Sequence, residues 1–168
     1  EGDGTHAVSW SPDMQYYVDS WSRVDLPMVA ELHRASDRSL VMALERADDS
    51  ALRATGWKPH EVFGAEERDG SSDIWGIVIR PRHFDPRRKY PVVENIYAGP
   101  HGSFVPKTLS AQAGMPAIAE LGFVVVQIDG MGTSTGSKAF HDVAWKNLAS
   151  AGFPGRFLWK KARPGTYQ

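Results

Sequence analysis

The 168-residue chain contains no cysteine, and this absence removes several kinds of site at once. Disulfide bonds, zinc sites built from thiolates and cysteine nucleophiles are excluded. A chain without cysteine suits a reducing and an oxidising compartment equally, so the sequence leaves the localisation open. Long apolar stretches are missing as well, because no run approaches the roughly 18 apolar residues that a membrane-spanning helix needs. We therefore expect no membrane segment in this chain.

Neither sign of charge is in excess. The chain has 19 Lys and Arg against 20 Asp and Glu, for a net charge of −1, and the two signs are interleaved. Proteins that bind nucleic acid or anionic membranes usually carry a basic patch. The one basic cluster, between Arg80 and Lys89, flanks Pro81 and Pro86 and is typical of a solvated loop. We expect no nucleic-acid partner.

The first part of the chain contains short strand-like segments. They run over Thr5–Trp10, Gln15–Ser20, Met28–His33 and Ser39–Leu44, with turn residues between them. Strands at about ten-residue spacing favour an antiparallel meander, which is the unit of a β-propeller blade or of a sandwich. The pattern occurs once, so a propeller is not deducible from repetition.

A short helix and a hairpin are expected next. Asp48–Thr55 has an aspartate that can cap a helix, is followed by Gly56 as a stop, and links the two halves of the chain. Two longer strands, Glu61–Glu67 and Asp73–Arg80, flank Arg68–Ser71, whose central Asp-Gly pair is typical of a tight hairpin turn.

Beyond residue 90 the pattern changes to alternating strands and helices. We expect strands at Pro91–Tyr97 and Phe123–Asp129, a helix at Ser110–Leu121 that Gly122 ends, and a second helix from a Ser137 cap to about residue 149. Strands that are almost continuously apolar and alternate with helices are typical of a parallel sheet covered on both faces. The predicted fold class is therefore α/β, with a right-handed crossover between the two strands.

Two segments follow the carboxyl ends of these strands, where open α/β sheets bind their ligands. They are residues 97–102 and 129–136, and the second contains a literal G-x-S-x-G motif around Ser134. This motif forms the nucleophile elbow of α/β-hydrolases, which makes Ser134 a candidate nucleophile. Against this, Ser134 lies five residues past its strand, and His141 and Asp142 are too close in sequence to fold back over it. The alternative is that Ser134 only shapes a glycine-rich loop.

Cofactor sites have weak support. The glycines at 130, 132 and 136 do not fit the G-x-G-x-x-G fingerprint, and Asp129 would face a pyrophosphate with like charge. The six histidines form no H-x-x-x-H or H-E-x-x-H pair, and His60 and His83, beside prolines, are expected to be solvated. We expect neither a metal nor an organic cofactor.

Tyr97 ends the first predicted parallel strand and precedes Ala98, Gly99 and Pro100, where small residues let a ligand approach the backbone. A phenol at this point can direct its O–H into the ligand crevice and donate to the negative charge that develops on a carbonyl oxygen, as one arm of an oxyanion hole. The alternative is a tyrosine that only packs. The residues alone leave both interpretations open.

Taken in order, several short motifs resemble the dipeptidyl peptidase IV and prolyl oligopeptidase family of serine peptidases. These motifs are Thr5-His6, Trp10–Asp13, Tyr17–Ser20, Asp25–Pro27, Arg80–Val93, Ile96–Pro100, Ile128–Gly132 and Lys138–Asp142. The resemblance implies an N-terminal β-propeller over an α/β-hydrolase domain, whose Ser–Asp–His triad cleaves short peptides, often after proline. On this basis we expect residues 1–47 to end the propeller, 48–60 to form a linker, and 61–168 to begin the hydrolase domain.

The resemblance also implies roles for single residues. Tyr97 would supply an oxyanion hydroxyl, Ser134 would be a loop residue, and the nucleophile, acid and base would lie past Gln168. We therefore expect the chain alone to be inactive, with a peptide as the substrate of the full-length parent. The tail Ala162–Gln168 departs from the family, because it breaks the helical pattern expected there.

Two other functions stay open. One is a small serine esterase or peptidase that uses Ser134. The other is a non-catalytic module that self-associates, because the predicted strand Pro91–Tyr97 would have an unpaired edge, and such an edge invites pairing with another chain.

Overall fold

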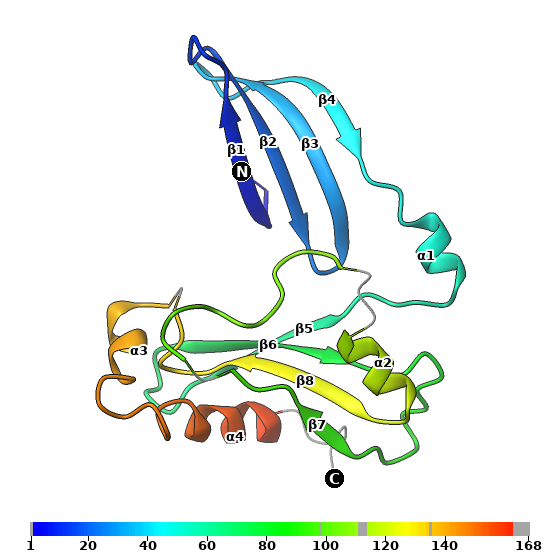
Figure 1. The fold of residues 1–168 in the computed structure, drawn as a ribbon, viewed down its shortest axis with the longest axis vertical. Coiled ribbons are helices and arrows are strands. Elements are labelled where there is room, and N and C mark those ends of the chain that lie inside the picture. Colours follow the sequence, from blue (N-terminus) through cyan, green and yellow to red (C-terminus); the bar gives the residue numbers. More distant parts are fainter. Residues whose placement is uncertain (1, 98, 111–113, 135, 163–168) are drawn as a thin grey trace. The chain divides into compact units, whose positions relative to one another are not determined.

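The chain folds into two units, each built on its own four-stranded sheet (Figure 1). The computed structural model describes residues 2–97, 99–110, 114–134 and 136–162. The first unit comprises Glu1–Pro59 with Pro106–Ala111, and the second comprises His60–Val105 with Gln112–Gln168. The chain thus passes into the second unit at residue 60 and returns briefly to the first after residue 105.

The first sheet is an antiparallel meander, as predicted. Its strands are β1 (Thr5–Trp10), β2 (Tyr16–Arg23), β3 (Leu26–Arg34) and β4 (Leu40–Arg46), and they follow one another in the order β1-β2-β3-β4. Cross-strand ring pairs stabilise one face of it. The ring of Tyr17 stacks on that of His33 with the centroids 5.2 Å apart.

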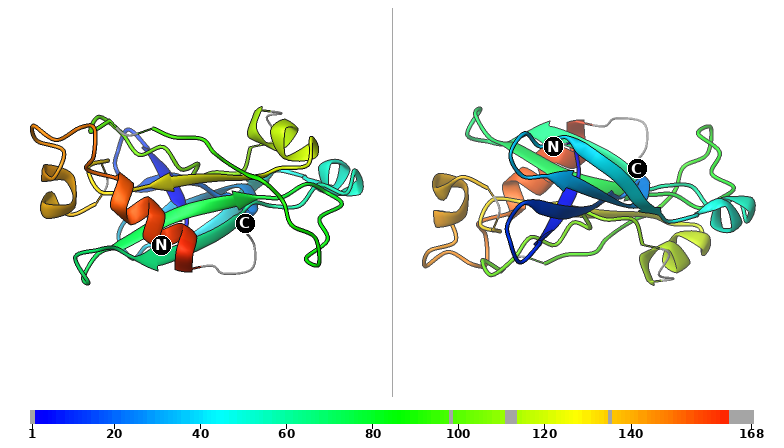
Figure 2. Two further views of the ribbon diagram at one scale, coloured as in Figure 1. Left: turned by 90° about the horizontal axis from the view of Figure 1, so that it is seen from below. Right: turned by 90° about the horizontal axis from the view of Figure 1, so that it is seen from above.

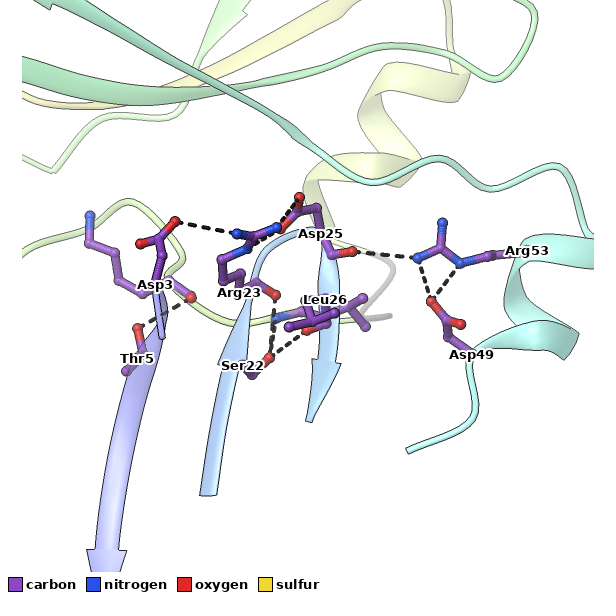
Figure 3. A network of polar contacts seen from close by, with 10 residues as sticks. Asp3, Thr5, Ser22, Arg23, Asp25, Leu26, Asp49 and Arg53 are labelled. Carbon is purple, nitrogen blue, oxygen red and sulfur yellow. Dashed lines mark hydrogen bonds and ion pairs between the residues drawn. The ribbon is translucent and has the colours of Figure 1, made fainter. Parts of the chain in front are cut away.

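Charged side chains connect the β2–β3 turn with the short helix α1 (Ser50–Ala54), as Figure 3 shows. Arg23 Nε donates to Asp25 Oδ1 at 2.8 Å, and Arg53 Nη2 donates to the Asp25 carbonyl at 3.5 Å. Asp49 at the N-cap position makes no side-chain cap, and its carboxylate binds Arg53 Nε at 2.6 Å. The carboxylate of Asp48 accepts instead from the amide of Ser50, the first residue of α1, at 2.8 Å. The predicted glycine stop is confirmed by a φ of 82° at Gly56, where the chain leaves the helix.

Hydrogen bonds hold the returning segment to the first sheet. The Leu109 amide donates to Ser22 Oγ at 3.2 Å, and Thr5 Oγ1 donates to the Lys107 carbonyl at 3.3 Å. These contacts explain why residues 106–111 fold with the first unit, although their neighbours in sequence belong to the second.

The second sheet mixes antiparallel and parallel pairing. Its strands are β5 (Glu61–Glu66), β6 (Asp73–Ile79), β7 (Val92–Glu94) and β8 (Val124–Asp129), in the order β5-β6-β8-β7. The predicted β5–β6 hairpin is confirmed, and Gly70 in its turn has a φ of 65°. β7 and β8 pair in parallel, which confirms the predicted strand–helix–strand unit.

Apolar strand β8 lies at the centre of the second unit because both of its faces are covered. Every residue of β8 is buried. Helices α2 (Gly114–Glu120) and α4 (Phe153–Ala162) lie on opposite sides of the sheet (Figures 1 and 2). Trp159 of α4 is fully buried, packs edge-on against Phe63, and donates its indole N–H to the Phe63 carbonyl at 2.8 Å. The α/β class is thereby confirmed.

The predicted strand Pro91–Tyr97 was too long. The strand is confined to Val92–Glu94, and its residues are half-buried rather than buried. Pro91 has no N–H to contribute to the ladder. The Asn95 amide still donates to the Val126 carbonyl at 2.9 Å, after which the chain leaves the sheet.

Two helices are also shorter than predicted. α2 begins at Gly114, whereas the expected start at Ser110 is not helical and residues 111–113 lie outside the described residues. α3 (Lys138–Asp142) has the predicted cap, with Ser137 Oγ accepting from the Phe140 amide at 3.1 Å. It ends long before residue 149 because turns follow, in which Lys146 has a φ of 54°.

Other expectations were partly confirmed. His83 is exposed as predicted, but His60 is half-buried, and burial lowers the pKa of its imidazole. Ala162, the first residue of the predicted irregular tail, is still helical as the last residue of α4, and residues 163–168 lie outside the described part of the chain. Among the described residues, no helix has the length and apolar character needed to cross a bilayer.

Candidate active-site loops

The loops that follow β7 and β8 lie side by side, as the sequence predicted for the carboxyl ends of two neighbouring parallel strands. The Ser134 amide donates to the Gly102 carbonyl at 3.2 Å. Asp129, the last residue of β8, accepts with Oδ1 from the amides of Phe104 at 2.6 Å and Val105 at 3.1 Å. A carboxylate that accepts two backbone amides makes strong, charge-assisted hydrogen bonds, so Asp129 fixes the later part of the β7 loop.

The loop after β8 turns sharply and is tightly packed. Thr133 Oγ1 donates to the Gly130 carbonyl at 2.9 Å, and Gly132 has a φ of 97°, a conformation that glycine adopts readily. A Cβ atom added at Gly130 would lie 2.9 Å from the carbonyl oxygen of Gly152. Glycine at position 130 therefore lets the β8 loop approach the backbone before α4.

Ser134 is half-buried in this loop, and Thr135 beside it lies outside the described residues. Nε2 of His141 lies 3.1 Å from the Pro100 carbonyl and must donate to it, so this nitrogen is not a base for a serine in this arrangement. Asp142 forms an ion pair with Lys138, which lowers the pKa of the Asp142 carboxyl. Ser134 as a nucleophile stays a prediction.

Tyr97 lies three residues beyond the end of β7 and is half-buried. Its ring is 5.7 Å from that of Phe104, centroid to centroid. Its hydroxyl folds back over Gly99, where an added Cβ would come within 2.6 Å of the Tyr97 hydroxyl oxygen. The small residue after Tyr97 therefore makes room for the tyrosine ring itself, whereas the sequence had suggested room for a ligand. Ala98 between them lies outside the described residues.

A buried charged group beneath these loops was not predicted. Arg156 of α4 is only 2% exposed, donates through Nη1 to Glu94 Oε1 at 2.6 Å, and donates through Nη2 to the Tyr97 carbonyl at 2.7 Å. Lys160 Nζ donates to the other oxygen of Glu94 at 2.7 Å. The sequence carried a signal for this group, because Arg156 shares a helix face with Trp159, and a charge on an apolar face needs a partner.

A hollow of about 570 Å³ adjoins the two loops. Its lining is mostly apolar and consists of Pro100, His141, Asp142, Ala144, Trp145, Lys146 and Leu148. Within the described residues, no group of three or more His, Asp or Glu side chains is arranged to hold a metal ion. Tyr97 lies three residues beyond β7 and does not line this hollow, and its hydroxyl as an oxyanion donor stays a prediction.

No protein-family model matches the chain. Curated relatives do match it. A Sordaria macrospora protein named probable dipeptidyl-aminopeptidase B is 30% identical over 133 residues, and dipeptidyl-aminopeptidase B of Aspergillus niger is 28% identical over 149 residues. These alignments cover 78% and 86% of this chain, but only 14% and 16% of the two relatives. The chain thus spans about a seventh of the length of the curated relatives that it matches.

Solved structures give the same result. Dipeptidyl peptidase 4 of Porphyromonas gingivalis is 26% identical, with a TM-score of 0.72 over 88% of this chain and 21% of that one. A Bacteroides ovatus protein assigned as a dipeptidyl aminopeptidase IV shares the fold, with a TM-score of 0.83 over 93% of this chain and 22% of that one, at 23% identity. The resemblance drawn from the sequence motifs is confirmed: the chain is a relative of the dipeptidyl peptidase IV family of serine peptidases.

Proposed function

We propose that the chain is part of a serine-type peptidase that hydrolyses short peptides, often after proline. In this proposal residues 1–47 are the last strands of a β-propeller, 48–60 form a linker, and 61–168 are the N-terminal part of an α/β-hydrolase domain. Two features support it. An antiparallel meander precedes a sheet with a parallel β7–β8 pair, and the relatives that match the chain carry dipeptidyl aminopeptidase names.

The proposed reaction is acyl transfer. A serine attacks the peptide carbonyl with a histidine as base, and the tetrahedral oxyanion is held by the Tyr97 hydroxyl and a backbone N–H. The observation that carries this proposal is the place of Tyr97. Its phenol stands just past the carboxyl end of β7, over Gly99, and its main chain is bound by Arg156. Open α/β sheets hold their substrates at that edge.

The chain supplies only part of this machinery. It carries one oxyanion donor, whereas the nucleophile, acid and base are proposed to come from the rest of the parent protein. The mechanism requires no metal or organic cofactor, and the proposed partner is the peptide substrate. The chain alone should therefore be inactive, even though it contains a residue that contributes to catalysis in the parent.

The first test uses the chain alone with Ala-Pro-p-nitroanilide, whose cleavage releases a coloured product. We expect no release above the buffer rate. Turnover that disappears in Ser134→Ala would instead make the chain an enzyme in its own right. Labelling of wild type but not of Ser134→Ala by a fluorophosphonate probe would lead to the same conclusion.

The second test asks what Tyr97 does in a complete enzyme. The chain replaces the segment that it matches in the Aspergillus niger relative, and kcat of the active chimera is measured. Removing one oxyanion donor typically lowers kcat by about 10²–10³-fold, so Tyr97→Phe should have an effect of this size. Tyr16→Phe is the matched control, because the Tyr16 hydroxyl makes only a 3.4 Å contact with an exposed Arg34. An equal kcat in both variants would refute the proposed role.

A second candidate function is a non-catalytic module that self-associates through β7. The observation in its favour is that β7 is the edge strand of the second sheet in the described residues. Residues 91 and 95 bond to β8, so in the alternating parallel ladder the Val92 N–H faces the open edge. Light scattering tests the candidate: concentration-dependent dimers that are lost in Val92→Pro would support edge pairing, since proline removes this donor. A monomer with protected amides in β7 would exclude it.

A further inference from the structure

Arg156 lies where helix α4 meets the loops after β7 and β8. Its side chain is 2% exposed, and its guanidinium stays charged under all physiological conditions. A buried cation is tolerated only when it is paired and its donors are satisfied. The groups that bind Arg156 are therefore the parts of the chain that this charge holds in place.

Two arms of the guanidinium bind two points on one stretch of chain. Nη1 binds Glu94, the last residue of β7, at 2.6 Å, and Nη2 binds the carbonyl of Tyr97 at 2.7 Å. Between these points the chain leaves the sheet after the Asn95 amide bond to Val126. The main chain of Tyr97 is therefore beyond the strand ladder, and Arg156 holds it against α4.

The same side chain also lies close to the β8 loop. Nε of Arg156 lies 3.5 Å from the position of a Cβ at Gly130, and 3.4 Å from that at Gly152. Neither glycine could carry a larger side chain without disturbing the guanidinium or the neighbouring backbone. Arg156 thus binds the chain after β7 and leaves no free space beside Gly130 in the β8 loop.

We propose that Arg156 is a positioning residue for the Tyr97 hydroxyl. This inference rests on the proposed function, in which that hydroxyl donates to the oxyanion. Arg156 acts through the main chain of Tyr97 and does not need to touch the substrate. Glu94 orients the guanidinium, and Gly99 leaves the space into which the ring folds. The planar fork is essential, because it binds an oxygen of Glu94 and an oxygen of Tyr97 at once.

Fluorine NMR of the full chain labelled with 3-fluorotyrosine tests this directly. The chain has five tyrosines, and Tyr97→Phe identifies the resonance of interest. Arg156→Lys keeps a cation beside Glu94 but loses the fork, so the Tyr97 resonance should shift or broaden. Lys160→Met is the matched control, because it removes the other cation on Glu94 without touching Tyr97, and the resonance should stay in place. Gly99→Ala displaces the phenol directly and provides the reference resonance of a displaced Tyr97 ring.

The outcomes separate positioning from general support of the fold. A folded Arg156→Lys chain with an unchanged Tyr97 resonance would overturn the proposal, because a cation alone would then be sufficient. So would a Lys160→Met chain whose resonance moves as much as that of Arg156→Lys. If Arg156→Lys does not fold, Glu94→Met replaces it: it removes the acceptor of one arm of the guanidinium and should broaden the same resonance, and no change would again overturn the proposal. Failure of the proposed function is read separately, as an unaltered kcat for Tyr97→Phe in the chimera.

Discussion

Gly76 in β6 is packed closely against backbone and a buried ring, and replacing it with alanine tests the fold. An added Cβ would lie 2.7 Å from the Gln127 carbonyl oxygen and 2.8 and 3.0 Å from two ring atoms of Trp159. Neither neighbour can retreat easily, because one is the backbone of central strand β8 and the other is a fully buried indole. Overpacking of this kind typically costs about 1–3 kcal/mol.

Native-state hydrogen exchange of the β8 amides measures this cost within the second unit, because opening of that strand requires its sheet to unfold. We expect Gly76→Ala to lower the opening free energy by about 1–3 kcal/mol. Gly114→Ala is the matched control, since a Cβ there meets nothing within 4 Å and alanine favours the helix that begins at this residue.

A double-mutant cycle shows which neighbour resists the new methyl group. Trp159→Phe alone removes the hydrogen bond to the Phe63 carbonyl, at a cost of about 1–3 kcal/mol. The smaller ring also gives space to the methyl group introduced by Gly76→Ala, so the double variant should be less destabilised than the sum of the two, by about 0.5 kcal/mol or more. Protection within about 0.5 kcal/mol of wild type in Gly76→Ala alone would refute this account of the packing.

Three further predictions follow from local contacts. Gly130→Ala should lower the melting temperature and shift the amide resonances of the β8 loop, because its Cβ would lie 2.9 Å from the Gly152 carbonyl; unchanged spectra would show that the two backbones are not in close contact. Hydrogen bonds from Ser72 and Ser71 lower the pKa of exposed Asp69 to about 2. The stabilising contribution of Asp69 should therefore be present above the ordinary pKa of 3.8 and be lost as the pH falls toward 2. Urea unfolding of wild type and Asp69→Ala as a function of pH measures this difference in stability. Burial lowers the pKa of His60, so the free energy of unfolding should fall as the pH drops below 6.5, where the unfolded chain gains the proton first. His60→Gln should weaken this pH dependence. An equally steep loss of stability in His60→Gln would mean that another group causes it.

Much of the fold could be predicted because its signals are local. The meander of the first unit follows from alternating residues between turn signals, and β8 from a continuous apolar run. The strand at Pro91–Tyr97 was overestimated, because Ile96 and Tyr97 are typical strand residues whereas the ladder ends after Asn95. The end of α3 could not be predicted either, since lysine at position 146 does not indicate a left-handed backbone conformation.

The candidate site, too, has a part that the sequence predicts and a part that it does not. Tyr97 could be proposed from the sequence because a residue just past a parallel strand lies at the ligand edge of the sheet, and its role stays a prediction. Arg156 could not be paired with Glu94 from sequence, because the two are 62 residues apart and no local pattern joins them. The purpose of Gly99 was also misjudged: whether a glycine admits a ligand or a neighbouring side chain depends on a torsion angle that the sequence does not specify.

The segment 106–111 has a consequence for dissecting this protein. Because these residues bind Ser22 and Thr5, the first unit is assembled from two separate stretches of the polypeptide. Cleavage at the Pro59–His60 bond would therefore not liberate a complete N-terminal module. A recombinant version of that module would need the hexapeptide supplied in trans, or joined by an artificial linker, to recover its full set of contacts.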